Sequence, residues 1–319
     1  MSLSRTPTWK RTFPVIQSPG RHVNSAAYAK AAVLLCLSLL IVALWITRPT
    51  TPEDLLHPDT NSTESEPKQY TSDDAISYYG ALPSIGTGVD ATVLRNQLHK
   101  LISNQRRVKR REQWAVIAES ATVDDTLITL FYSQRLTPAA HKASGEHQHQ
   151  PDYWNREHIW PRSFGLKKTR ADADLHNIVP ADRTINSSRG NKAFADGGRP
   201  HNECGGCRAD RDSWELPDIV KGDVARIIFY MALRYDGNDS TGTRDLHVLA
   251  PGAKTTAAKA GFGDVTTLLR WHCNDAVSAS EIHRNNTIYQ SQGNRNPYVD
   301  APQWVEAIHG ACETGMSPT

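Results

Sequence analysis

The run AAVLLCLSLLIVALWIT, residues 31–47, contains no charged side chain and constrains what the rest of the chain can become. A core helix normally keeps a polar face, so this run is typical of a membrane anchor or of the apolar centre of a signal peptide. Basic residues precede it: Arg5, Lys10, Arg11, Arg21 and Lys30. We therefore expect residues 1–30 to stay in the cytoplasm and the chain after the run to be exported. No small-residue cleavage motif follows directly, so two outcomes stay open: a cleaved signal, or a retained anchor that contacts the membrane through residues 31–47.

Residues 48–74 are rich in Pro, Thr, Ser and acidic side chains, which predicts a solvated linker. The folded part is then residues 75–319, which would be periplasmic, secreted or held outside the membrane. The chain of 319 residues is 39% hydrophobic, enough to bury a sizeable core. Its formal net charge of +2 gives no general attraction for nucleic acid, so any such attraction must come from local clusters.

The apolar pattern of residues 75–319 predicts a single α+β domain without internal repeats. One helix is expected to begin near Asp90, with four apolar residues on one face: Leu94, Leu98, Leu101 and Ile102. The stretch TLITLFYS, residues 126–133, predicts a strand. Later helices are expected over residues 222–237, 265–274 and 278–297, the last ending in the turn NRNP.

Export would place the cysteines in an oxidising compartment. Cys36 lies in the apolar run, which leaves an even number beyond it: Cys204, Cys207, Cys273 and Cys312. A zinc site with four thiolates usually presents two close C-x-x-C pairs, whereas only CGGC at 204–207 is close here. We therefore predict two disulfides, Cys204–Cys207 and Cys273–Cys312.

Three polar stretches follow one another in the middle of the chain: REHIWP (156–161), DLHNIVP (174–180) and DRTINSSRGN (182–191). Each is ambiguous alone. Together they predict a strand that carries Glu157 and His158, a short strand at 177–180, and a helix that carries Asn186. In such a unit the first strand and the helix can direct side chains at one point.

This grouping suits phosphodiester hydrolysis. His158 can supply a neutral imidazole that takes a proton from water. Glu157 and Asn186 offer hard oxygen ligands suited to one Mg²⁺, which keeps several waters and commonly bridges to phosphate. An arginine would offset the charge on the scissile phosphate, and arginines are dense in this part of the chain.

The stretches REHIWPRS, DLHNIVPADRTINSSRGN and QGNRNPYVD (292–300) resemble the motifs of the bacterial endonuclease I family. The resemblance runs from about residue 89 to the last cysteine. It implies a ββα-metal (His-metal finger) core within a mainly helical domain, and Mg²⁺-dependent, sequence-nonspecific cleavage of DNA, often also of RNA, to 5′-phosphate ends. By position it makes His158 the general base and Glu157 and Asn186 the metal ligands. The phosphate-contacting arginine stays open among three residues: Arg162, Arg170 and Arg199.

Two other functions use the same residues. One is a catalytically inactive relative that only binds nucleic acid, which would lack the base or a ligand, and none is missing here. The other is a metal-dependent phosphodiesterase for small substrates, which would need a closed pocket. No protein partner is implied. Four neighbours are interpreted as structural rather than functional: Trp154, Trp160, His176 and Asn191.

Overall fold

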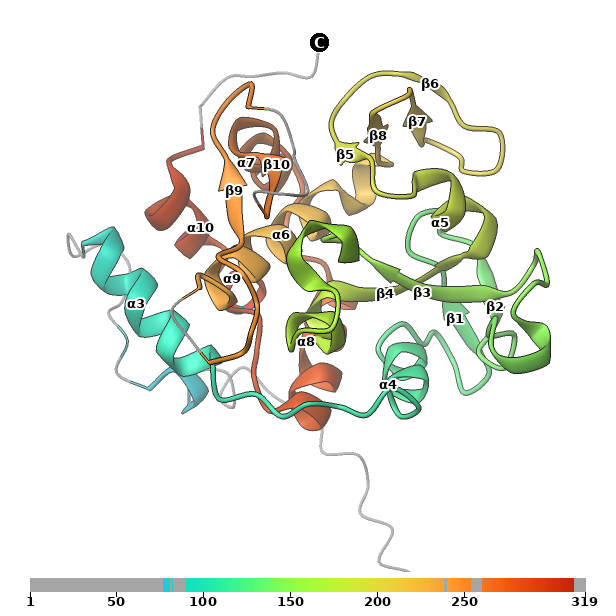
Figure 1. Ribbon diagram of the computed structural model, residues 1–319, viewed down its shortest axis with the longest axis horizontal. Helices are drawn as coiled ribbons and strands as arrows, with labels where there is room; N and C mark the ends of the chain where they lie inside the picture. Colours follow the sequence, from blue (N-terminus) through green and yellow to red (C-terminus); the bar gives the residue numbers. More distant parts are fainter. Residues whose placement is uncertain (1–76, 81, 83–89, 238–239, 254–259, 313–319) are drawn as a thin grey trace, which may run out of the picture. The chain divides into compact units, whose positions relative to one another are not determined.

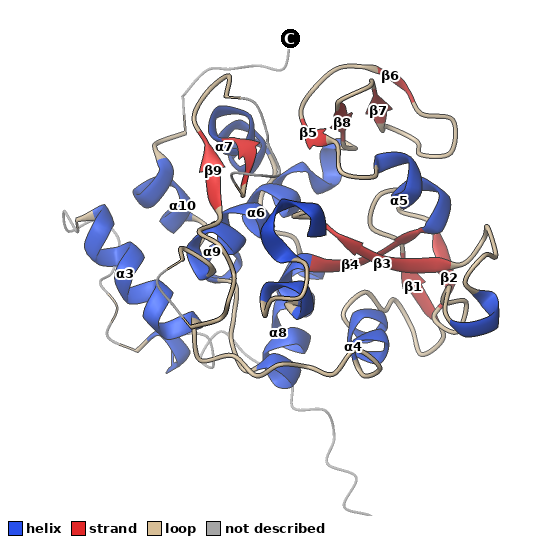
Figure 2. Cartoon of the chain, in the orientation of Figure 1, coloured by secondary structure: helices blue, strands red, loops and turns tan. Residues whose placement is uncertain are grey.

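The described strands form four small sheets, and helices make up most of the other regular structure (Figure 2). The computed structural model describes residues 77–80, 82, 90–237, 240–253 and 260–312. All of them belong to one compact unit, Gln69–Thr319. The segments predicted before residue 75, including the apolar run at 31–47, lie outside the described residues. Within the described part, no helix is long and apolar enough to cross a membrane.

Mixed helices and short strands confirm the predicted α+β class (Figure 1). The helices are α3 (Ala91–Ile102), α4 (Gln113–Glu119), α5 (Arg183–Arg189), α6 (Lys221–Arg234), α7 (Val265–Asn274), α8 (Ala279–Gln292), α9 (Pro297–Asp300) and α10 (Gln303–His309). The strands are β1 (Leu127–Thr129), β2 (Leu136–Pro138), β3 (Trp154–His158), β4 (Ile178–Asp182), β5 (Ala193–Phe194), β6 (Arg199–Pro200), β7 (Arg208–Ala209), β8 (Ser213–Glu215), β9 (His247–Leu249) and β10 (Gly261–Asp264).

Helix α6 forms the centre of the hydrophobic core. Every residue from Gly222 to Arg234 is buried, and α3, α7 and α9 pack against it. Asp223 in its first turn suits the positive end of the helix dipole. The helix expected over 222–237 is confirmed, although it ends at Arg234 because Tyr235 leaves the helical conformation (φ −121°, ψ 61°).

Capping side chains set the ends of two other predicted helices. Asp90 begins α3 by accepting hydrogen bonds from the backbone N–H groups of Thr92 and Val93. Ser278 and Glu281 form a capping box at the start of α8. Its last residue is Gln292, and Gly293, whose φ of 86° is left-handed, caps its C-terminus, so that the turn NRNP lies outside the helix.

The strand expected over 126–133 is shorter than predicted. Only Leu127–Thr129 pairs as β1, antiparallel to β2. The chain then turns, because the N–H of Gln134, a residue with a φ of 57°, donates to the carbonyl of Leu130 at 2.9 Å. The expected length was wrong, and the turn has a consequence for the site, since it contains Tyr132.

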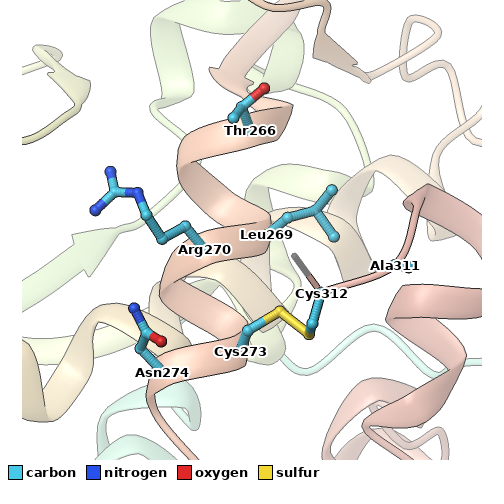
Figure 3. Close-up of a pocket in the computed structure, with 7 residues that line it drawn as sticks. All are labelled: Thr266, Leu269, Arg270, Cys273, Asn274, Ala311 and Cys312. Atoms are coloured by element: carbon cyan, nitrogen blue, oxygen red, sulfur yellow. A yellow bond between two sulfur atoms is a disulfide. The ribbon is translucent and has the colours of Figure 1, made fainter. Parts of the chain in front are cut away.

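Two disulfides confirm the predicted pairing. Cys204 joins Cys207 across a Cα–Cα distance of 5.3 Å, and both side chains are buried in the core. Cys273 in α7 joins Cys312, which follows α10, across 5.8 Å (Figure 3). The second bridge links two segments that are 39 residues apart in sequence.

Candidate active site

Strands β3 and β4 and helix α5 form a ββα unit (Figure 1). The strands pair antiparallel, with Glu157 opposite Val179 and His158 opposite Ile178, and α5 follows β4 directly. The side chain of Asn177 holds the chain that follows β3. Its Oδ1 accepts from the Trp160 N–H at 2.7 Å, and its Nδ2 donates to the Trp160 carbonyl at 3.1 Å. This order of elements is the one that the three polar stretches predict.

The unit brings the three predicted functional residues to one cavity of about 230 Å³. Glu157, His158 and Asn186 all line it. The other lining residues are Arg156, Pro161, Arg162, Ser163, Gly190 and Asn191. We call this space the site cavity.

Glu157 is held rigidly. Its Oε1 accepts from the hydroxyl of Tyr132 at 2.6 Å and from Nη1 of Arg189 at 2.8 Å, and its Oε2 accepts from the His158 N–H at 3.0 Å. Burial raises the pKa of the carboxyl, while Arg189 and these hydrogen bonds oppose the rise. A buried Arg–Glu pair of this kind keeps a charged carboxylate in an apolar setting, with a lone pair of Oε2 still open.

His158 is held by a backbone carbonyl. Its Nε2 lies 3.2 Å from the carbonyl oxygen of Asp172, and a carbonyl can only accept, so Nε2 carries the proton in the neutral ring. Nδ1 is then the basic nitrogen. Burial lowers the pKa of His158 to about 4, which leaves the ring neutral at pH 7. The neutral ring therefore keeps a lone pair on Nδ1.

Asn186 is oriented by its amide nitrogen. Its Nδ2 donates to Oδ1 of Asn155 at 2.7 Å and to the Arg156 carbonyl at 3.4 Å. No described residue donates to its Oδ1. The amide oxygen is thus left available to a ligand in the site cavity.

The three candidate arginines lie in different places. Arg162 lines the site cavity and forms an ion pair with Asp172, with Nη2 at 2.7 Å from Oδ2. Arg170 donates to the backbone carbonyl of Gln105, and Arg199 is exposed in β6. Neither Arg170 nor Arg199 lines the site cavity, so Arg162 is the one of the three candidates that lies there with His158.

Several residues that support the site were not singled out from the sequence. Arg189 lies one turn after Asn186 in α5, and this spacing could have placed it beside Glu157. Arg156 lines the cavity and stacks on Trp114, with 4.6 Å from its guanidinium carbon to the ring centre. Burial and the neighbouring Arg110 and Arg162 lower the pKa of Arg156 to about 10. The roles of Tyr132 and of the Asp172 carbonyl have no signal in residue type or spacing.

The neighbours interpreted as structural include two core tryptophans. Trp154 and Trp160 are fully buried, as expected. Asn191 is exposed, lines the site cavity and donates to the Ser163 hydroxyl at 3.3 Å. His176 is buried beneath the unit and its ring packs on Tyr230, with ring centres 4.6 Å apart.

The donors in the site cavity fit a hard divalent cation. The carboxylate of Glu157 and the amides of Asn186 and Asn191 line the cavity. No group of three His, Cys, Asp or Glu side chains able to hold a metal occurs among the described residues. Zinc sites usually have three or four such protein ligands. Mg²⁺ keeps several waters and needs only one or two protein oxygens, so the chemistry of this donor set fits Mg²⁺.

Comparison with known proteins shows which family the chain resembles. Residues 91–303 match the endonuclease I family. The extracellular ribonuclease of Bacillus amyloliquefaciens is 36% identical over 259 residues, which cover 79% of this chain and 83% of the relative. The extracellular ribonuclease of Bacillus subtilis is 37% identical over 224 residues, 67% of this chain and 73% of the relative. An extracellular deoxyribonuclease of Aeromonas hydrophila is 26% identical over 136 residues, 41% of this chain and 50% of the relative.

Proposed function

The chain belongs to the endonuclease I family of nucleic-acid-hydrolysing enzymes, and from this premise we propose that it is a Mg²⁺-dependent, sequence-nonspecific endonuclease that acts outside the cytoplasm. One observation carries the proposal: Glu157, His158 and Asn186 line the same cavity. The two disulfides and the extracellular relatives support the compartment.

The proposed substrate is the phosphodiester backbone of RNA and DNA. Some relatives are named ribonucleases and others deoxyribonucleases, which supports this breadth. The two Bacillus relatives, which cover 79% and 67% of this chain, are ribonucleases. No Phe, Tyr or Trp occurs among the residues that line the site cavity, so nothing there offers a stacking surface to a base. Contacts to the backbone alone would explain cleavage without sequence preference.

In the proposed mechanism His158 takes the proton. Its Nδ1 accepts a proton from a water molecule while the Nε2–H donates to the Asp172 carbonyl and holds the ring in place. The water oxygen attacks phosphorus, the bond from phosphorus to the 3′ oxygen breaks, and the products carry a 5′ phosphate and a 3′ hydroxyl. The proton needed by the leaving oxygen comes from solvent. Arg162, at the wall of the cavity, offsets the charge that builds on the phosphate.

Glu157 and Asn186 would hold the cation through Oε2 and Oδ1. A bound Mg²⁺ supplies Lewis-acid stabilisation of the charge on the phosphate and the leaving oxygen. Arg189 and Tyr132 keep the Glu157 carboxylate fixed for that purpose.

Cleavage of supercoiled plasmid and of a single-stranded RNA by the exported chain tests the proposal. We expect both to be cut with Mg²⁺ and neither with EDTA, and the new RNA ends to carry 5′ phosphates. A 2′,3′-cyclic phosphate product would mean attack by the substrate's own 2′ hydroxyl and would contradict the role of His158. Absence of any cleavage across Mg²⁺, Mn²⁺ and Ca²⁺, with nucleic acid still bound, would instead indicate an inactive binding relative.

A further inference from the structure

One fully buried carboxylate, that of Asp174, takes no part in the proposed mechanism. It lies in the turn before β4 and has no exposed surface. Five hydrogen bonds of 2.8 to 3.0 Å reach it. The donors are the backbone N–H of His176, the side-chain amides of Gln105 and Gln292, and the hydroxyls of Tyr230 and Tyr235. Burial acts to raise the pKa of Asp174, but these hydrogen bonds help to hold it below its ordinary value, so the carboxylate is charged at pH 7.

The four side-chain donors tie the turn to the helical part of the fold. Gln105 follows α3, Tyr230 and Tyr235 lie in and just after α6, and Gln292 is the last residue of α8. Gln292 also holds the backbone of the turn, because its Oε1 accepts from the Leu175 N–H at 2.8 Å. Asp174 does the same through the His176 N–H, at 3.0 Å from its Oδ1. The turn is therefore fixed to α6 and α8 through Asp174.

This turn carries two groups that hold the end of β3. The carbonyl of Asp172 lies 3.2 Å from Nε2 of His158, and the side chain of Asn177 holds the backbone of Trp160. Asp174 lies between these two groups and bonds to the chain on both sides. Its N–H donates to the Ala171 carbonyl at 3.3 Å, and its own carbonyl accepts from the Asn177 N–H at 3.1 Å.

The tautomer of His158 depends on the position of the Asp172 carbonyl. No hydrogen bond to Nδ1 of His158 occurs among the described residues, so the carbonyl is what keeps the proton on Nε2. Displacement of the carbonyl would allow the proton to move to Nδ1, which would remove the basic nitrogen. Fixing the turn thus fixes the chemical state of the ring.

We propose that Asp174 is a positioning residue for the general base: its buried carboxylate holds the turn so that the Asp172 carbonyl stays on Nε2 of His158. This inference rests on the proposed function. Asp174 acts through the backbone of the turn and touches neither the substrate nor the reacting atoms.

His176 provides a matched control within the same turn. It is also fully buried, but its ring is directed away from the turn, with Nε2 at 3.0 Å from the carbonyl of Asn294. Loss of this ring removes buried packing without removing a hydrogen bond to the backbone of the turn. His176→Ala should therefore destabilise the fold and leave the Asp172 carbonyl in place.

Asp174→Asn tests the proposal in the full exported chain. The variant keeps the size of the side chain and an acceptor for the His176 N–H, but its amide group replaces an oxygen that accepts three donors. We expect kcat on a single-stranded oligonucleotide to fall about 10- to 100-fold, the usual effect of a small misplacement of a catalytic group. KM and the affinity for Mn²⁺ should stay near wild type. His176→Ala, assayed like Asp174→Asn well below its melting temperature, should keep kcat within a few-fold.

Ring ¹⁵N nuclear magnetic resonance at pH 7 gives a readout that lost stability alone does not change. His158, assigned by the signals missing from His158→Ala, should carry its proton on Nε2 in wild type and in His176→Ala. In Asp174→Asn a second form with the proton on Nδ1 should appear. If Asp174→Asn does not fold, Tyr235→Phe replaces it, because it removes one donor to Asp174 and keeps the ring, and the same two changes should appear at smaller size.

A single Nε2–H tautomer in Asp174→Asn would overturn the inference, and so would a fall in kcat no larger than that of His176→Ala. A parallel loss of Mn²⁺ affinity would show general loosening of the site and would also overturn it. All three results leave the proposed function intact. If the wild-type protein cleaves nothing, the proposed function fails, and the tautomer of His158 still decides whether Asp174 positions the ring.

Discussion

The end of β3 and the turn before β4 each carry a histidine, and the two imidazoles have similar surroundings. Burial lowers the pKa of both His158 and His176 to about 4. In each ring Nε2 faces a backbone carbonyl, that of Asp172 at 3.2 Å and that of Asn294 at 3.0 Å. Both rings are therefore neutral at pH 7 and carry their proton on Nε2.

The difference lies in the other nitrogen. Neither Nδ1 has a hydrogen-bond partner among the described residues, but only the Nδ1 of His176 is buried. His158 lines the site cavity, whereas His176 lies beneath Asn294 and Tyr230 with no exposed surface. A shifted pKa alone thus does not identify a catalytic histidine, and access to the basic nitrogen separates the two cases.

Exchanging each histidine for alanine should give the largest contrast. His158→Ala should lower kcat by about 10²- to 10⁴-fold, the usual contribution of a general base. His176→Ala should keep kcat within a few-fold of wild type when it is assayed well below its melting temperature, and should lower the free energy of unfolding instead. Plasmid cleavage and thermal unfolding of the same samples check both. A His158→Ala protein that cleaves as fast as wild type would remove the proposed mechanism.

Arg189→Met tests how much the buried ion pair between Arg189 and Glu157 stabilises the fold. Arg189 is fully buried against Glu157, so its loss leaves a carboxylate without its counter-charge. The free energy of unfolding at pH 7 should fall by about 3–5 kcal/mol, the usual cost of breaking a buried pair. Urea unfolding measures it, with Arg211→Ala, at an exposed pair, as the control expected to match wild type. A loss below about 1 kcal/mol would show that Glu157 is protonated or otherwise compensated.

Lowering the pH tests whether His176, in the turn before β4, is buried in its neutral form. The pKa of His176 is about 4 in the folded protein and about 6.5 when unfolded, so its contribution to stability is complete above pH 6.5 and is lost as the pH falls towards 4. The free energy of unfolding should decline across that window by at most about 1.4 kcal/mol per pH unit for this residue. His176→Gln should make the decline shallower, whereas the exposed His149→Gln should not. Identical slopes in all three proteins would contradict the assignment.

Much of the site region could be predicted from the sequence, because residue type and order carry it. Glu157, His158 and Asn186 lie on elements whose local pattern predicts a strand and a helix, and the structure brings these residues to one cavity. The cysteine pairing could be predicted because export favours disulfides, and because Cys204 and Cys207 are close in sequence, which leaves Cys273 and Cys312 as the second pair.

The supports of the site could not be predicted in the same way. Tyr132 reaches Glu157 only because β1 ends early in a turn, and the signal for that turn is the backbone conformation of Gln134 rather than a Gly or Pro. The partner of His158 is a backbone carbonyl, which every residue possesses.

A Mn²⁺ titration followed by electron paramagnetic resonance tests the central claim most directly, because it separates holding the metal from taking the proton. Wild type and His158→Ala should bind one ion per chain with similar affinity, although only wild type cleaves. Glu157→Gln/Asn186→Ala should bind at least tenfold more weakly while it keeps its fold. Unchanged Mn²⁺ affinity in that double variant would show that the metal lies elsewhere, and the assignment of Glu157 and Asn186 would be wrong.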